Sequence, residues 1–217
     1  MLPSMKLTGC ALTAGAICLW ISWALMPDAA TNNADHILTA VESSRGNVRA
    51  SALLQLLGAA LVVPGLVAEG APERGTRAGA VVLLWGAMGM AADAVYHQLA
   101  FEMTARGVAR DAVLPVMANM QLVDLRSLVP LLLAFLVGAI VLGWQRVRRR
   151  LGARWAARML MAPALIIPIG IVAVAALGLP RRIVVLVTLG AICGGLIGVG
   201  LEGARADKAP PDRRLTV

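Results

Sequence analysis

The chain has 217 residues, of which 59% are hydrophobic and only 15% are charged. Soluble domains carry about 25% charged residues, so this composition excludes an ordinary soluble domain and favours a protein embedded in a bilayer. The formal net charge of +8 does not indicate nucleic-acid binding. The basic residues lie in short segments between apolar stretches, and the few aromatic residues do not alternate with them as a nucleic-acid surface would require.

Six apolar stretches follow one another along the chain, and a membrane-spanning helix takes about 20 such residues. The first, 7–26, is longer than the roughly 7–15 residues of a signal-peptide core, so we interpret it as a retained helix. Prolines 163 and 168 predict a kink in the fifth stretch, and a tight turn at 180–182 must separate it from the sixth. We therefore predict an all-α bundle of six transmembrane helices, which cover 7–26, 50–68, 78–100, 128–144, 159–179 and 183–201.

The loops between these stretches predict the orientation of the chain. With both termini in the cytoplasm, thirteen Lys and Arg residues lie in inside segments and seven in outside segments, which agrees with the positive-inside rule. The use of Arg over Lys, beside abundant Ala, Gly, Val and Leu, is typical of a GC-rich bacterial genome. We predict a bacterial inner-membrane protein with one membrane domain, 1–203, and a polar cytoplasmic tail, 204–217, with little tendency to fold.

Two long connections, 31–49 and 102–127, then face outward. Both carry apolar residues at helical spacing, which predicts one short amphipathic helix in each. Asn33 is expected to be the N-cap of the first of these helices, which would start at Ala34.

A polar group lies inside the third stretch, where Asp93, Tyr96 and His97 interrupt an apolar run. Ionisable residues at membrane depth are costly and are therefore a functional-site hypothesis. Asp93 and His97 are four residues apart, so their side chains can meet on one helix face. Gly86 and Gly89 have the same helical spacing, which predicts that this face contacts a neighbouring helix rather than lipid.

Three further residues are candidates for this site. Arg49 and Arg126 lie at the outer mouths of neighbouring spans and are candidate partners of Asp93, and Gln55 is a candidate contributor from the second span. The functional interpretation is an outward-opening site that handles protons or binds a ligand. The structural alternative is a polar network that holds the third helix in place, because structural ion pairs perturb ionisable groups as active sites do.

Two other features concern packing and lipid. Gly190, Gly194 and Gly198 form a continuous small face on the sixth span, which predicts close helix–helix contact within the bundle or between protomers. A basic segment follows the fourth span, next to Trp144 and Trp155, and is typical of contact with anionic lipid headgroups. Its members are Arg146, Arg148, Arg149, Arg150, Arg154 and Arg158.

The outward connection that leads through 49–58 (Arg-Ala-Ser-Ala-Leu-Leu-Gln-Leu-Leu-Gly) into the second span resembles a class of small bacterial polytopic inner-membrane proteins, known as domains of unknown function. The resemblance covers the first four spans. It implies a six-helix inner-membrane bundle and transfers no activity and no site residues.

Catalytic and metal-binding motifs are absent from the sequence, so no catalytic residue, metal or cofactor is predicted. The first functional hypothesis is a non-enzymatic membrane protein that binds a lipid or a partner protein, including a second copy of itself, through its outer helices or glycine faces. The alternative is a small proton-coupled transporter that uses Asp93 and His97. A third, a haem-binding or lipid-modifying membrane enzyme, has the least support, because only His36 and His97 could serve as histidine ligands.

Overall fold

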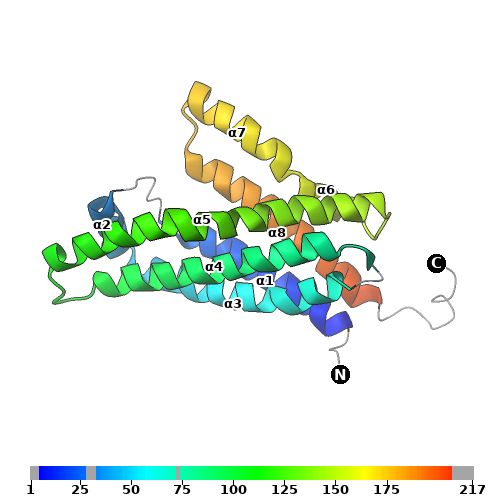
Figure 1. The fold of residues 1–217 in the computed structure, drawn as a ribbon, viewed down its shortest axis with the longest axis horizontal. Coiled ribbons are helices and arrows are strands. Elements are labelled where there is room, and N and C mark those ends of the chain that lie inside the picture. The colour runs from blue at the N-terminus through cyan, green and yellow to red at the C-terminus, as the bar shows by residue number, and fades with distance from the viewer. Residues whose placement is uncertain (1–4, 28–32, 72–73, 207–217) are drawn as a thin grey trace.

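The computed structural model describes residues 5–27, 33–71 and 74–206, and the elements in these ranges are α-helices (Figure 1). The all-α prediction is therefore confirmed. Of the predicted tail, 207–217 lies outside the described residues, whereas 204–206 belong to the last helix. The helices are α1 (Met5–Leu25), α2 (Ala34–Ser43), α3 (Arg45–Glu69), α4 (Arg77–Met103), α5 (Arg110–Arg148), α6 (Arg154–Met161), α7 (Pro163–Leu177) and α8 (Arg181–Ala206).

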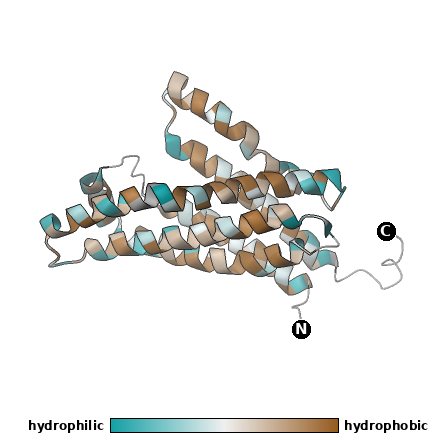
Figure 2. Ribbon diagram, in the orientation of Figure 1, coloured by the Kyte–Doolittle hydropathy of each residue, from teal (hydrophilic) through white to brown (hydrophobic). Residues whose placement is uncertain are grey.

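Five of these helices are long and apolar enough to cross a membrane, namely α1, α3, α4, the Arg126–Arg148 part of α5, and α8. Figure 2 shows apolar residues along most of their lengths and polar residues gathered toward their ends. The pair α6–α7 passes the same test only as one span bent by 40°. The fold therefore fits a multi-pass membrane protein with five or six spans.

Local sequence explains the bend and the turn that follows it. Pro163 occupies the first turn of α7, a position at which the backbone N–H has no partner within the helix, so its absence costs nothing. The same proline prevents α6 from continuing into α7 as one unbroken helix. Gly178 ends α7 in the left-handed conformation, with φ 66°. Because this conformation is accessible to glycine without strain, the chain reverses within a few residues and α8 starts at Arg181. The turn thus lies at 178–180, two residues earlier than the predicted 180–182.

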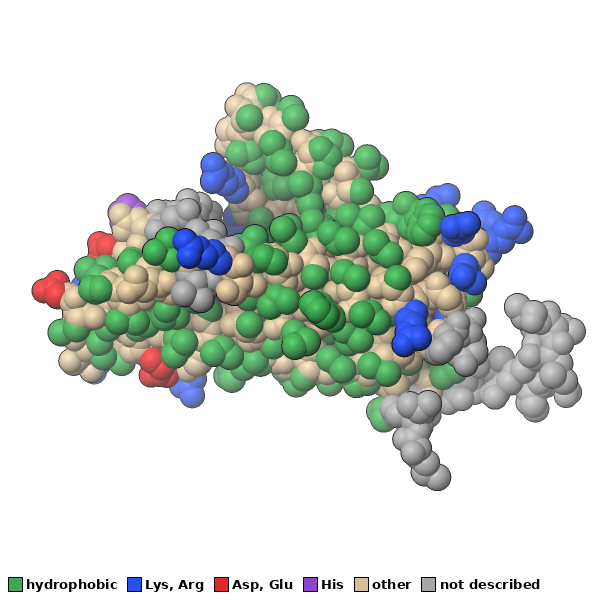
Figure 3. All heavy atoms as spheres, viewed as in Figure 1, with side chains coloured by type: hydrophobic (Ala, Val, Ile, Leu, Met, Phe, Trp, Pro, Cys, Tyr) green, Lys and Arg blue, Asp and Glu red, His purple; other side chains and the backbone are tan. Residues whose placement is uncertain are grey.

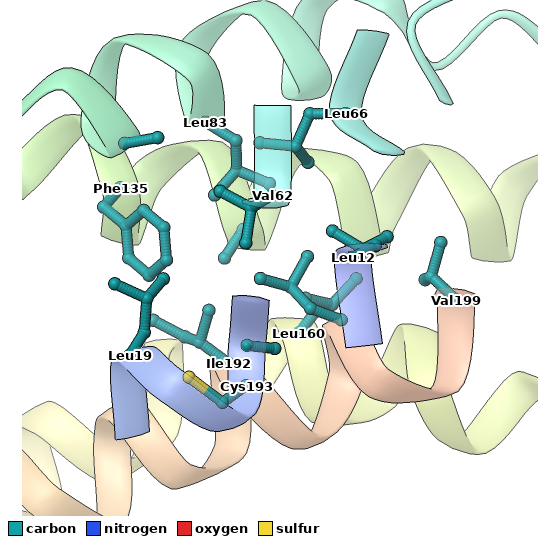
Figure 4. Packing of buried hydrophobic residues seen from close by; sticks show 14 of the residues in the cluster. Leu12, Leu19, Val62, Leu66, Leu83, Phe135, Leu160, Ile192, Cys193 and Val199 are labelled. Atoms are coloured by element: carbon teal, nitrogen blue, oxygen red, sulfur yellow. The ribbon is translucent and has the colours of Figure 1, made fainter. Parts of the chain in front are cut away.

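The long helices pack side by side in an order that differs from their order in the chain. Helix α1 lies between α8 and α3, α3 packs on α4, and α4 packs on α5. Short α6 bridges α5 and α8, whereas α7 leans away from the bundle and contacts mainly α8 (Figure 1). The core between them combines side chains from α1, α3, α4, α5, α6 and α8, including Leu12, Val62, Leu83, Phe135 and Leu160 (Figure 4).

The two ends of the bundle differ in charge. We call the end where α5 passes into α6 and where both described chain ends lie the basic end, because Lys and Arg gather there (Figure 3). The opposite end, the cap end, carries α2. There Arg110 at the start of α5 binds Asp35 at 2.8 Å and Glu42 at 3.5 Å, and Leu38 and Val41 of α2 are buried.

The two predicted connecting helices have different outcomes. Asn33 caps α2, since its side chain accepts hydrogen bonds from the backbone of Asp35 and His36, as predicted. The second connection forms no separate helix, because Arg110 already begins α5 and this helix runs without interruption to Arg148. Its 39 residues extend about 58 Å, nearly twice the hydrocarbon thickness of a bilayer, so the predicted fourth span is only the second half of one long helix.

Candidate functional site

The structure brings Asp93, Gln55 and His97 together between α3 and α4. Asp93 and Gln55 are 5% and 1% exposed. Gln55 Nε2 donates a hydrogen bond of 2.7 Å to Asp93 Oδ2, and His97 Nδ1 lies 3.7 Å from the same oxygen. That last distance is too long for a hydrogen bond, so the imidazole lies beside the carboxylate without a hydrogen bond to it.

The residues around this cluster are mostly apolar. Gln55 Nε2 is also 3.7 Å from the Met90 sulfur, and the Tyr96 hydroxyl lies 3.9 Å from the sulfur of Met117 in α5. His97 Nδ1 is buried and has no hydrogen-bond partner among the described residues. The cluster is therefore a small polar group in apolar surroundings, and its carboxylate, that of Asp93, accepts one short hydrogen bond, from Gln55.

The two arginines proposed as partners of Asp93 do not reach it. Arg49 and Arg126 are both exposed, and none of the ion pairs among the described residues joins either arginine to Asp93. An exposed guanidinium stays hydrated at little cost, whereas reaching a buried carboxylate would strip it of water. The neutral amide of Gln55 takes their place as the hydrogen-bond donor.

The five candidate packing glycines lie against other helices of the same chain. A Cβ added at Gly86 would meet the Phe135 backbone, and one at Gly89 would meet Leu131, both in α5. This glycine face therefore packs against α5, whereas Asp93, predicted to share it, reaches α3. Gly194 and Gly198 lie against side chains of α6, and Gly190 lies against Trp20 of α1.

A second polar cluster at the basic end was not singled out from the sequence. Arg146, which is 4% exposed, bridges the carboxylates of Glu69 in α3 and Glu202 in α8. Glu69 also binds Arg74 at 2.6 Å, and Glu202 accepts a hydrogen bond from the Ala153 backbone. One buried arginine thus ties together the ends of three long helices.

This geometry corrects the grouping of Arg146 with the lipid-facing arginines. The positive charge of Arg146 is neutralised inside the protein, because two carboxylates from neighbouring helices bind it. The remaining members of the segment are exposed, as expected for the basic segment: Arg148, Arg149, Arg150, Arg154 and Arg158. Arg148 lies over the Trp144 ring at 5.3 Å, a distance typical of a cation–π contact.

The described residues form apolar cavities that open on the sides of the bundle, of which we consider two. The larger, of about 470 Å³, is a groove between α1 and α8. The smaller, of about 280 Å³, lies where α7 and the start of α8 diverge from α5, and Met90 forms part of its wall. Residues of the larger groove are Ile17, Trp20, Ile21, Leu186, Val187, Gly190, Cys193, Gly194 and Ile197.

The described ranges contain no group of three or more His, Cys, Asp or Glu residues arranged to hold a metal ion. No family model, curated protein or solved structure matches the chain. The geometry of the polar clusters and cavities is therefore the basis for any functional proposal.

Proposed function

We propose that the chain is a multi-pass protein of a bacterial inner membrane that binds membrane lipid rather than catalysing a reaction. In this proposal α6 and α7 form one bent span, which makes six, and both termini are cytoplasmic. The excess of Lys and Arg at the basic end supports this orientation. Helix α2 then lies at the outer face as an amphipathic cap.

The groove between α1 and α8 is the observation that carries this proposal. On the α8 side, Gly190 and Gly194 leave space between the apolar side chains of Leu186, Val187 and Ile197, and Trp20 and Ile17 form part of the α1 side. The groove lies along two apolar spans, where lipid tails surround the protein. Because association within lipid depends on van der Waals packing, a shaped apolar groove favours one acyl chain over the disordered chains around it.

Filling the groove tests the proposal. Ile17→Trp adds volume at a position that is 42% exposed, so the fold should be retained. We expect its affinity for phospholipid to fall roughly tenfold, the effect of losing about 1.4 kcal/mol of packing. The measurement is native mass spectrometry of the detergent-purified chain titrated with phospholipid. Leu53→Trp, at an exposed α3 position outside the groove, is the control, and equal binding by both variants would contradict the proposal.

A proton-coupled carrier is the second candidate, and one observation favours it. Met90 contacts Gln55 on one side and lines the 280 Å³ cavity on the other. Met90 therefore lies between Gln55 of the Asp93 cluster and a space that opens on the side of the bundle. A buried carboxylate next to an imidazole is a suitable proton-accepting pair for such a carrier.

Asp93→Asn separates this carrier from a purely structural network. Asparagine retains an oxygen that accepts the Gln55 hydrogen bond, so the free energy of unfolding should change by less than about 1.5 kcal/mol. A carrier should nevertheless lose proton flux, measured with a pH-sensitive dye in proteoliposomes under an imposed potential. Asp111→Asn, at an exposed acid in α5, is the matched control. Equal flux in wild type and Asp93→Asn would leave the cluster a structural role only.

A further inference from the structure

A cavity lined by arginines lies at the basic end, where α5 passes into α6. Its volume is about 470 Å³, and Arg146, Arg150, Arg154 and Arg158 form much of its wall. Arg154 and Arg158 are four residues apart in α6, so they project from one side of that helix. Arg150 approaches from the preceding turn, where its φ is 55°.

The charges around this cavity are not balanced. Arg146 is neutralised by Glu69 and Glu202. By contrast, none of the ion pairs among the described residues includes Arg150, Arg154 or Arg158. Three positive charges therefore surround a space large enough for a small anion, and like charges held this close repel one another unless an anion joins them.

Two further features of the backbone and the wall favour an anion. The first residue of α6 is Arg154. Glu202 accepts a hydrogen bond from the Ala153 backbone, but Ala153, the N-cap, provides no side-chain oxygen for the amides of the first helical turn. A helix N-terminus carries a partial positive charge and attracts phosphate groups. Arg146 is held in the wall by its two carboxylates, and its Nε has no hydrogen-bond partner among the described residues.

We propose that this cavity binds one phosphate group, held by Arg150, Arg154 and Arg158 beside the N-terminus of α6. A phospholipid headgroup and a free phosphate ion share this chemistry. Trp144 and Trp155 favour the headgroup, because both are about half exposed (49% and 50%) and tryptophan is enriched at the membrane–water interface. The proposal rests on the lipid-binding function proposed above, and it adds a defined anionic site to it.

The experiment compares two double variants that lose the same charge from the same segment. Arg154→Gln with Arg158→Gln removes two of the positive charges that line the cavity. Arg148→Gln with Arg149→Gln removes two exposed arginines that do not line it. Each full-length chain, in detergent, is titrated with phosphatidylglycerol or phosphatidylcholine, and bound lipid is measured by native mass spectrometry. Both lipids carry a phosphate group, but the choline cation of phosphatidylcholine would be repelled by the arginines around the site. We expect the preference for phosphatidylglycerol to fall roughly tenfold in the first variant, as the loss of charge-assisted hydrogen bonds predicts, and to change less than twofold in the second.

The outcomes distinguish the two proposals. A wild-type chain that retains no phospholipid would overturn the lipid-binding function itself. Retention without a preference for phosphatidylglycerol, or an equal loss of preference in both double variants, would overturn only the phosphate site. Addition of inorganic phosphate identifies the source, since displacement of phosphatidylglycerol at millimolar phosphate means that a free ion occupies the site equally well. Circular dichroism confirms that both variants keep their helical content.

Discussion

Replacing Arg146 with Met should destabilise the protein by about 3–5 kcal/mol, because it leaves one buried and one partly buried carboxylate without their shared partner. Glu69 is 2% exposed and also binds Arg74, whereas the side chain of Glu202 is 25% exposed. Most of the lost free energy of unfolding should therefore come from leaving the Glu69 carboxylate without Arg146. Denaturant titration of the helical circular-dichroism signal in detergent measures the free energy of unfolding.

Two companion variants show whether the ion pairs cause this loss. Arg149→Met removes an exposed arginine three residues away and should change stability by no more than about 0.5 kcal/mol. Adding Glu69→Gln and Glu202→Gln to Arg146→Met removes the unpaired charges and should restore much of the loss. Equal destabilisation by Arg146→Met and Arg149→Met, or no recovery in the triple variant, would contradict the role assigned to the network.

The sequence contains a signal for this network that an analysis of single segments misses. Glu69 and Glu202 each follow the last residue of a predicted span, and Arg146 lies two residues past the end of another. Successive spans alternate in direction, so the second, fourth and sixth all end at the same face. Acids are rare in this chain, and two of them at that face beside an arginine could have predicted an ion-paired cluster instead of an entirely lipid-facing segment.

For the Asp93 cluster, the sequence predicted a contact within one helix but not the contact between helices. Helical spacing correctly placed Asp93 and His97 together, because a separation of four residues is a local property of one helix. Hydropathy placed Gln55 on the second span, as a possible contributor. It could not identify which residue would approach the carboxylate, since that depends on how α3 and α4 rotate against each other. The charged candidates Arg49 and Arg126 were chosen for their sign, and the shorter, neutral side chain makes the contact.

Hydropathy located the apolar helices but not the boundaries between them. It marked 128–144 as a separate span because 102–127 contains polar residues, yet those residues continue the same helical path through α5. Pro115 and Pro130 lie inside α5 without ending it. At Pro163 the helix does bend. Proline alone does not distinguish these cases, because the outcome depends on whether neighbouring helices support the chain on both sides.

Adding one methyl group at Gly86 should destabilise the bundle more than the same change at any exposed glycine. A Cβ there would lie 2.3 Å from both the backbone N and the Cα of Phe135. Backbone atoms of a packed helix cannot move aside as a flexible side chain can, so α4 and α5 would have to separate along their contact. We expect Gly86→Ala to cost about 3 kcal/mol, the upper part of the range for overpacked sites.

Two other glycines provide graded controls for this prediction. At Gly194 an added Cβ would meet only the flexible end of Met159, at 2.6 Å from its methyl carbon, so Gly194→Ala should cost less than about 1.5 kcal/mol. At Gly46, in α3, nothing lies within 4 Å, and alanine should stabilise the helix by about 0.4–1 kcal/mol. Denaturant titration in detergent should rank the three variants in this order. A Gly86→Ala variant as stable as Gly194→Ala would mean that α4 and α5 do not pack at backbone contact.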